Sequence, residues 1–222
     1  MQFKSLSSVF FLACILALIS TAGAQTDVAA SVYGAFSGTT TGNGIQQSPS
    51  NSAGALVELR HIANPILGFE ATYSFNRNDQ TYQYAGNTPL APGTGTCPVS
   101  ATTCSNAPVV VPANAHELTL DWTPSLHFAN FRPFGVLGAG LLLNVPSNSS
   151  VAIPDGNGST QTSTKPVYVY GAGLDWGFLP HIGLRVQYRG NLYHAPDLTS
   201  LTSSSGKFTQ TAEPMVGIYF RL

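Results

Sequence analysis

The stretch that decides the fold is the end of the chain, Phe208-Thr-Gln-Thr-Ala-Glu-Pro-Met-Val-Gly-Ile-Tyr-Phe-Arg-Leu222. Successive side chains of a β-strand point to opposite faces. One parity is apolar and consists of Ala212, Pro214, Val216, Ile218, Phe220 and Leu222. The other parity is mixed and consists of Glu213, Met215, Gly217, Tyr219 and Arg221. Because the apolar face continues to the last residue, where chains usually fray in water, it predicts a strand that closes a lipid-embedded barrel.

The same residues resemble the C-terminal signal of bacterial outer-membrane β-barrels. That pattern has a glycine followed by aromatic or apolar residues at alternating positions, and Gly217, Phe220 and Leu222 match it. Met215 stands where a polar residue is usual, and Leu222 stands where the family prefers an aromatic residue. The resemblance implies that the barrel-assembly machinery reads this strand.

Composition points to the same class of protein. Only 9% of the 222 residues are charged and 43% are hydrophobic, whereas a soluble domain carries roughly 25% charged residues. No apolar run approaches the ~20 residues of a membrane-spanning helix. Low charge without such a helix is typical of membrane β-barrels, in which only alternate residues meet lipid. The net charge of −1 offers no basic surface for nucleic acid.

Residues 1–24 have the features of a secretory signal peptide. Lys4 supplies the positive charge, Val9–Ile19 is an apolar segment too short to cross a membrane, and Ala22-Gly-Ala24 is a small-residue cleavage site. Cleavage there would leave residues 25–222, a length that suits one barrel domain.

Eight segments have the apolar content or the alternation of β-strands, and residues typical of turns separate them. The expected strands are 27–37, 52–63, 66–82, 115–126, 131–145, 165–178, 181–194 and 208–222. We therefore predict an all-β fold, an eight-stranded antiparallel up-and-down transmembrane β-barrel.

The predicted connections alternate in length. Those after the second, fourth and sixth strands are short. The others are long and rich in Ser, Thr, Gly, Asn and Pro: Gly38–Asn51, Gln83–Asn114, Pro146–Thr164 and Ala195–Lys207. Outer-membrane barrels have this arrangement, so we expect periplasmic termini and extracellular long loops.

Parity also predicts which side chains point inward. In most strands the large aromatic residues lie opposite the charged ones. Eight strands leave an interior just wide enough for side chains, and an arginine facing lipid at mid-bilayer would cost ~2–4 kcal/mol. We expect a network of paired charges inside the barrel, because buried charges need partners. Its predicted members are Glu58, Arg60, Glu70, Glu117, Asp121, Asp175, Arg185, Arg189, Glu213 and Arg221. The first and fifth strands are apolar on both parities, so their facing is not predicted.

Two cysteines, Cys97 and Cys104, lie in the longest connection. In an exported protein a disulfide is the expected state of such a pair. A metal site is the alternative, but it lacks a nearby histidine, since the nearest is His116 at the start of a predicted strand.

His194 and the residues after it hold the side-chain types from which a hydrolase could build a catalytic site. Asp197, Thr199 and Ser200 follow it, but Pro196 disfavours a fixed triad. A polar residue at the outer rim is the simpler interpretation. We predict no catalytic, cofactor-binding or metal-binding residues.

The segment Val186–Asp197, together with Thr211–Pro214 and the terminal residues, resembles small outer-membrane barrel proteins of an acidobacterial type. More generally, residues 25–222 resemble the OmpA-type transmembrane domain. The resemblance implies the fold and a location in the outer membrane, with outer-membrane lipid as a partner. It implies no defined substrate.

We therefore expect a non-enzymatic protein with an envelope-structural or surface-interaction role through its long loops, whose extracellular ligand the sequence does not identify. A narrow pore, a lipid A-modifying enzyme and a soluble periplasmic barrel are the alternatives. The directions of Arg185 and Tyr188 separate the membrane barrel from the soluble one.

Overall fold

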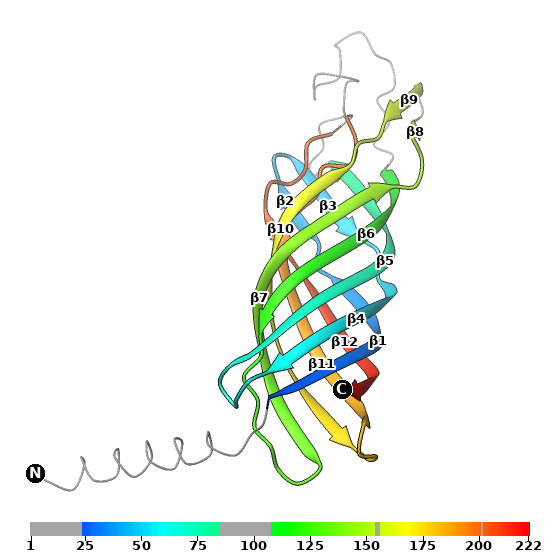
Figure 1. Cartoon of the computed structure of the whole chain (residues 1–222). Helices are drawn as coiled ribbons and strands as arrows, with labels where there is room; N and C mark the ends of the chain where they lie inside the picture. The colour runs from blue at the N-terminus through cyan, green and yellow to red at the C-terminus, as the bar shows by residue number, and fades with distance from the viewer. Residues whose placement is uncertain (1–23, 85–107, 154–155, 201) are drawn as a thin grey trace, which may run out of the picture.

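The computed structural model describes residues 24–84, 108–153, 156–200 and 202–222. Eight strands lie side by side, each antiparallel to its neighbours, and the pairing of β5 with β6 closes them into a barrel (Figure 1). These strands are β1 (Gln25–Ser37), β4 (Ser52–Ile62), β5 (Gly68–Tyr84), β6 (Val109–Trp122), β7 (Phe131–Pro146), β10 (Ser163–Gly177), β11 (Ile182–His194) and β12 (Phe208–Arg221). The predicted eight-stranded antiparallel β-barrel is confirmed.

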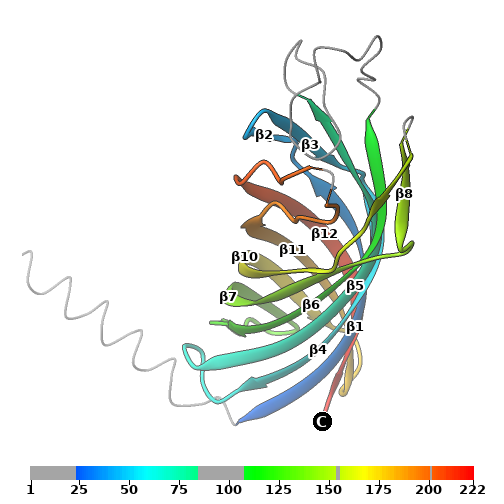
Figure 2. The ribbon, with the colours of Figure 1, turned by 90° about the horizontal axis from the view of Figure 1, so that it is seen from above.

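The first and last strands of the barrel, β1 and β12, pair with each other. β1 pairs with β12 from Asp27 opposite Arg221 to Ser37 opposite Thr211, so the two strands bring residue 25 and the C-terminus to the same end of the barrel. Short connections lie at this end, which we call the short-turn end, and the opposite end is called the long-loop end. Figure 2 shows the strands curving around a common interior.

Seven of the eight strands begin within two residues of the predicted positions, but β6 begins at Val109 instead of 115. The added residues pair with the end of β5, with Tyr82 opposite Val109 and Asp79 opposite Pro112. Val111 and Ala113 are buried, which explains why the segment extends the sheet. The sequence places this segment in the connection Gln83–Asn114, which is rich in Ser, Thr, Gly, Asn and Pro, so the prediction of a loop there is wrong for the residues from Val109 on.

The connection predicted at Gly38–Asn51 is partly strand. It forms a hairpin of β2 (Thr40–Gly42) and β3 (Ile45–Pro49), and β3 continues the sheet along the far part of β5. Asn43 and Gly44 form the turn with φ values of 51° and 72°. Positive φ at both central residues is what a two-residue hairpin turn requires, and Asn-Gly satisfies it.

The connection predicted at Pro146–Thr164 also contains a hairpin, β8 (Ser150–Ile153) paired with β9 (Gly156–Ser159). It stands beyond the barrel at the long-loop end (Figure 1). Two of the predicted loops therefore contain β-hairpins, of which β2–β3 joins the barrel sheet and β8–β9 forms a sheet of its own.

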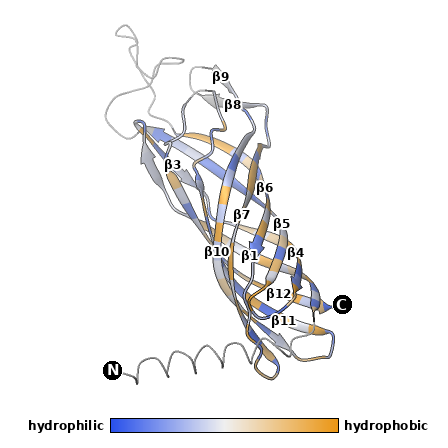
Figure 3. Ribbon diagram, turned by 60° about the vertical axis from the view of Figure 1, so that its left-hand side comes forward, coloured by the Kyte–Doolittle hydropathy of each residue, from blue (hydrophilic) through white to orange (hydrophobic). Residues whose placement is uncertain are grey.

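Side chains alternate between the interior and the exterior along the barrel strands. Figure 3 shows hydrophilic and hydrophobic residues alternating along the ribbons. Leu120 is 73% exposed and Phe69 is 58% exposed, while their neighbours Asp121 and Glu70 are each 1% exposed. The exterior is thus apolar and the interior polar, which inverts the pattern of a water-soluble barrel. Within the described ranges, no helix is long and apolar enough to cross a membrane.

Candidate functional site

Asp175, on β10, lies at the centre of the larger group of buried charges. Its carboxylate accepts hydrogen bonds from Arg185 Nε at 2.6 Å and Nη2 at 2.9 Å, and from Arg132 Nε at 3.0 Å and Nη2 at 2.7 Å. Arg60 Nη1 lies 3.4 Å from the same carboxylate. Three strands, β4, β7 and β11, therefore direct guanidinium groups at one acid. We call the whole group the Asp175 cluster: Asp27, Glu58, Arg60, Glu70, Arg132, Asp175 and Arg185.

Each arginine of the Asp175 cluster also pairs with a second acid. Arg60 Nε donates to Glu70 Oε2 at 2.6 Å, Arg185 pairs with Glu58, and Arg132 pairs with Asp27. Every member is at most 4% exposed. In so dry a site an unpaired charge would be very unfavourable, so the pairs are required for the barrel to fold around them.

Two aromatic rings lie against these guanidinium groups inside the barrel. The centroid of the Phe134 ring is 3.9 Å from Arg60 Cζ and 5.3 Å from Arg185 Cζ. The ring of Tyr219 lies 5.4 Å from Arg185 Cζ. A Cβ atom at Gly173 would come within 2.3 Å of the Phe134 ring, so glycine makes room for the ring. The rings add cation–π attraction and fill the interior.

A second group surrounds Arg189 and lies nearer the long-loop end. Arg189 Nη2 is 3.2 Å from Glu117 Oε1, and Nη1 is 3.4 Å from Asp121 Oδ2. Asn191 Nδ2 donates to Glu117 Oε2 at 2.9 Å. Glu213 lies opposite Arg189 in the β11–β12 register, is buried, and forms no ion pair among the described residues. We call Glu117, Asp121, Arg189, Asn191 and Glu213 the Arg189 cluster.

The structure places nine of the ten residues predicted for the interior network in the buried interior: Glu58, Arg60, Glu70, Glu117, Asp121, Asp175, Arg185, Arg189 and Glu213. The tenth, Arg221, is half-buried at the short-turn end and forms no ion pair with the described residues. Sequence reasoning missed Asp27 and Arg132. They lie on the first and fifth strands, where apolar residues on both parities hid the inward face.

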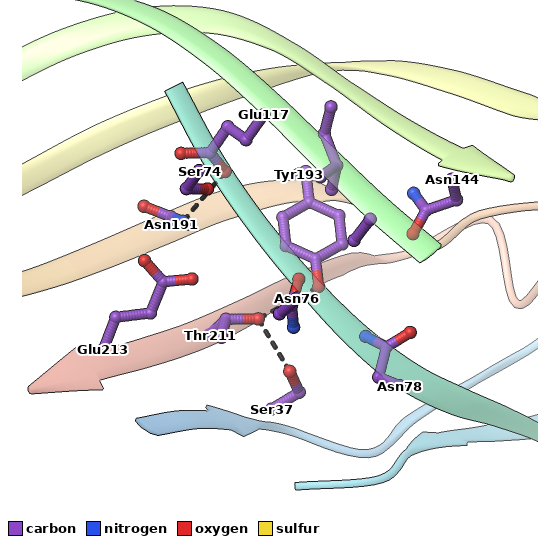
Figure 4. A pocket seen from close by; sticks show the side chains of 12 residues that line it. Ser37, Ser74, Asn76, Asn78, Glu117, Asn144, Asn191, Tyr193, Thr211 and Glu213 are labelled. Carbon is purple, nitrogen blue, oxygen red and sulfur yellow. Dashed lines mark hydrogen bonds between the residues drawn. The ribbon is translucent and has the colours of Figure 1, made fainter. Parts of the chain in front are cut away.

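Cavities approach the charge clusters from both ends of the barrel. At the short-turn end a cavity of about 320 Å³ is lined by Arg132, Tyr219 and Arg221. At the other end a pocket of about 20 Å³ lies beside the Arg189 cluster, and Figure 4 shows the polar side chains around it. The ion pairs, together with buried apolar and aromatic side chains such as Phe134, fill the interior between these two spaces.

At the long-loop end, the connection between β11 and β12 folds back over the barrel. Leu198 is fully buried in an apolar cluster with residues of β3, β5, β6 and β8. Tyr82 Oη donates to Pro196 O at 2.8 Å and accepts from Leu198 N at 3.2 Å. Gln47 Nε2 donates to Pro196 O at 3.0 Å. We call residues 195–200 and 202–207, with the two hairpins that they contact, β2–β3 and β8–β9, the crown.

An ion pair anchors the crown. Lys165 Nζ lies 3.0 Å from Asp197 Oδ2, and Ser204 N donates to Asp197 Oδ1 at 2.6 Å. Burial alone would raise the pKa of Asp197, but the hydrogen bonds from Ser204 and Lys165 outweigh it and hold the pKa below its usual value. Asp197 therefore keeps its charge and its contacts at neutral pH.

The residues considered for catalysis are not brought together. The ring of His194 packs against that of Phe208 in a tilted arrangement with 3.9 Å between centroids, and the carboxylate of Asp197 is bound by Lys165 and Ser204. In the described part of the chain, no group of three or more His, Cys, Asp or Glu side chains has the geometry to hold a metal ion. Cys97 and Cys104 lie outside the described residues.

The residues of the C-terminal signal lie on the strand that closes the barrel. Phe220 is 51% exposed and Leu222 is 78% exposed. A Cβ atom at Gly217 would come within 2.4 Å of Ala30 O on β1, so glycine allows the two strands to approach. The terminal strand therefore presents an apolar exterior and a close seam to β1.

Residues 10–211 match the protein family described as outer membrane protein beta-barrel domain. Among solved structures, Ail, the attachment invasion locus protein of Yersinia pestis, is similar over 90% of this chain and 100% of its own, with a TM-score of 0.51 and 12% identity. The outer membrane protein OprG from Pseudomonas aeruginosa is similar over 90% and 96%, with a TM-score of 0.50 and 10% identity. No curated protein matches this chain.

The outer membrane protease OmpT from Escherichia coli is also similar, over 92% of this chain and 98% of its own. Its TM-score is 0.43 and its identity is 11%, so this likeness carries no argument about activity. At identities this low, the likeness to Ail and OprG shows the fold alone.

Proposed function

Because the chain belongs to the outer membrane protein beta-barrel domain family, and is thus a β-barrel protein of the outer membrane, we propose that it acts without enzymatic activity, in envelope structure or surface interaction. The active surface is the crown. The exposed apolar side chains of the barrel face the lipid, which is the partner of the whole exterior.

The observation that carries the proposal is that the crown is ordered and tied together. Residues 195–207 contact β3, β5 and β9 through Gln47, Tyr82 and Ser159. Exposed polar side chains such as Ser203 and Lys207 cover this structure. A surface that is already ordered loses little conformational entropy on binding, which favours recognition of a partner.

The same proposal includes the orientation. Residues 1–24 direct export, the termini lie in the periplasm, and the crown lies outside the cell. β12 is the strand that the barrel-assembly machinery engages. The alternation of short turns and long connections supports this orientation.

Orientation is tested with single cysteines in a background where Cys97 and Cys104 are replaced by serine. Ser203→Cys reports on the crown, and Asn130→Cys reports on the short turn between β6 and β7. A membrane-impermeant maleimide should label Ser203→Cys in intact cells and Asn130→Cys only after lysis. The opposite labelling would contradict the proposed orientation.

The role is tested by replacing residues 199–206 with a Gly-Ser linker of equal length. Cells that carry this variant should show weaker adherence to matrix-coated surfaces, or greater leakage of periplasmic proteins, than cells with the wild-type protein. Equal amounts of folded barrel in the outer membrane are the control. Unchanged adherence and leakage would contradict the proposal, and an altered lipid A mass that is lost in His194→Ala would point to an enzyme.

A narrow pore is the second candidate, and the cavities at both ends of the barrel favour it. The two charge clusters lie between these spaces, so rearranged ion pairs could let ions through. In planar bilayers the surface-interaction proposal predicts no stable conductance from the wild-type protein. A defined conductance step that changes in Arg185→Ala would establish the pore instead.

A further inference from the structure

The buried interior carries more negative than positive charge. Within the described residues the buried carboxylates number seven and the buried guanidinium groups number four, an excess of three negative charges. The carboxylates are Asp27, Glu58, Glu70, Glu117, Asp121, Asp175 and Glu213, and the guanidinium groups are Arg60, Arg132, Arg185 and Arg189. Charges removed from water need compensation, which a further positive charge or protonation of an acid can supply.

The excess is greatest in the Arg189 cluster. The Asp175 cluster has three arginines for four acids, whereas Arg189 alone faces Glu117, Asp121 and Glu213. Glu117 uses both carboxylate oxygens, one for Arg189 and one for Asn191. Glu213 is 4% exposed, and its Oε2 has no hydrogen-bond partner in the protein. Glu213 is therefore the acid of the Arg189 cluster that forms no ion pair among the described residues.

The neutral side chain of Asn191, beside Glu213, also carries an oxygen without a hydrogen-bond partner in the protein. Asn191 is 1% exposed, and its Nδ2 donates to Glu117, which leaves Oδ1 as an acceptor without a protein partner. An ionised Glu117 can only accept hydrogen bonds, so the nitrogen of the Asn191 amide faces Glu117 and the oxygen faces away from it. Glu213 and Asn191 both line the pocket (Figure 4). Two buried oxygen acceptors on one pocket call for a cation or a donor.

The pocket suits an ion that binds oxygen. Its volume of about 20 Å³ is room for one small ion or one water molecule. Its other polar walls are hydroxyls and amides, including Ser37, Asn78 and Thr211, and it contains no histidine or cysteine. Its walls also carry the amide nitrogen of Asn144 and the apolar Ala115 and Leu142. Oxygen ligands without histidine or cysteine select hard cations, and Ca²⁺ tolerates irregular geometry where Mg²⁺ demands an octahedron.

We propose that the barrel binds a divalent cation of the Ca²⁺ type in this pocket, with Glu213 Oε2 and Asn191 Oδ1 as ligands and water completing the shell. Glu117, which also lines the pocket, and Asp121, which pairs with Arg189, contribute further negative charge. The site departs from the sequence-based expectation of no metal. It does not depend on the role proposed for the crown.

The experiment uses the full-length mature protein, refolded in detergent and freed of metal. Tb³⁺ replaces Ca²⁺ as a luminescent probe, since Tyr193 lines the pocket and can transfer excitation to it. We expect tyrosine-sensitised Tb³⁺ emission that Ca²⁺ displaces, and an unfolding temperature that rises with Ca²⁺ concentration. Loss of a residue that only supports a metal ligand weakens metal affinity by roughly 10–100-fold. Glu213 is proposed as a direct ligand, so Glu213→Gln should weaken binding at least about tenfold.

Glu58→Gln is the matched control, because it removes the same charge from the Asp175 cluster, outside the pocket. It should leave Tb³⁺ emission and the Ca²⁺ response within about twofold of the wild-type values. Gel mobility with and without boiling shows that each variant is folded. No response of the wild-type protein to millimolar Ca²⁺, equal losses in both variants, or stabilisation by Na⁺ alone would each overturn the proposal.

Discussion

Arg185 and Asp175 form an ion pair with two hydrogen bonds across neighbouring strands inside the barrel. Arg185 Nε lies 2.6 Å from Asp175 Oδ1, and Nη2 lies 2.9 Å from Oδ2. The two residues are directly opposed in the β10–β11 register, and both are 0% exposed. Paired donors and acceptors in this geometry give the strongest hydrogen bonds between side chains. The pair therefore joins two strands and closes the interior at the same point.

Replacing Arg185 by leucine should destabilise the barrel strongly. The change leaves Glu58 without its arginine and removes two of the bonds to Asp175, so buried charges lose their partners. Breaking a buried ion pair in this way costs ~3–5 kcal/mol. The free energy of unfolding in urea, measured in lipid vesicles, checks this value.

Val186→Ala is the neighbouring control for Arg185→Leu. Val186 is 52% exposed on the outer face, so its truncation should cost far less. Equal losses in the two variants would contradict the assignment of inside and outside.

An arginine on the outer face should be unfavourable in lipid. Leu118 is 60% exposed near the middle of β6, where Tyr73 on β5 lies opposite it. Leu118→Arg should destabilise the barrel folded in vesicles by ~2–4 kcal/mol. Ser203→Arg in the crown should change it by less than about 0.5 kcal/mol, because that position meets water. If both variants fold into vesicles equally well, the exterior does not face lipid.

Gly173 should resist even a small enlargement. A Cβ atom there would meet the Phe134 ring at 2.3 Å, and this ring lies under Arg60. Gly173→Ala should therefore cost ~1–3 kcal/mol through overpacking. Ala172→Val, one residue away on the exterior, should be tolerated. A neutral effect of Gly173→Ala in urea unfolding would show that the interior is loosely filled.

The anchor of the crown should depend on pH. Because the folded state lowers the pKa of Asp197, the stabilisation is complete above the ordinary value of about 3.9 and is lost as pH falls through the lower folded pKa. The amide shift of Ser204, followed by NMR, should titrate with a midpoint below 3.9. In Lys165→Met the midpoint should rise toward that value, since one of the two stabilising contacts is gone. A wild-type midpoint above 3.9 would contradict the contact.

Much of the fold could be predicted from local pattern, because the strand period of two makes the inward and outward faces visible in sequence. In β11, Arg185 and Arg189 alternate with Val186 and Tyr188, and the structure buries the arginines and exposes Val186 and Tyr188. In β1 and β7 the inward residues are mostly apolar, so Asp27 and Arg132 carried no such signal. The β2–β3 hairpin is also not visible in the local pattern, because its position in the sheet depends on the pairing of β3 with the distant β5.

The amino-acid sequence by itself determined that alternate residues meet an apolar surrounding, and thereby the number of barrel strands and the side on which most of the charges lie. Tertiary structure alone decided which charges meet. Asp175 receives arginines from three strands, and Glu213 shares a pocket with Asn191 while Arg189 turns to Glu117. Periodicity is a property of one strand, whereas an ion pair or a binding pocket depends on the register between strands, which only the closure of the barrel sets.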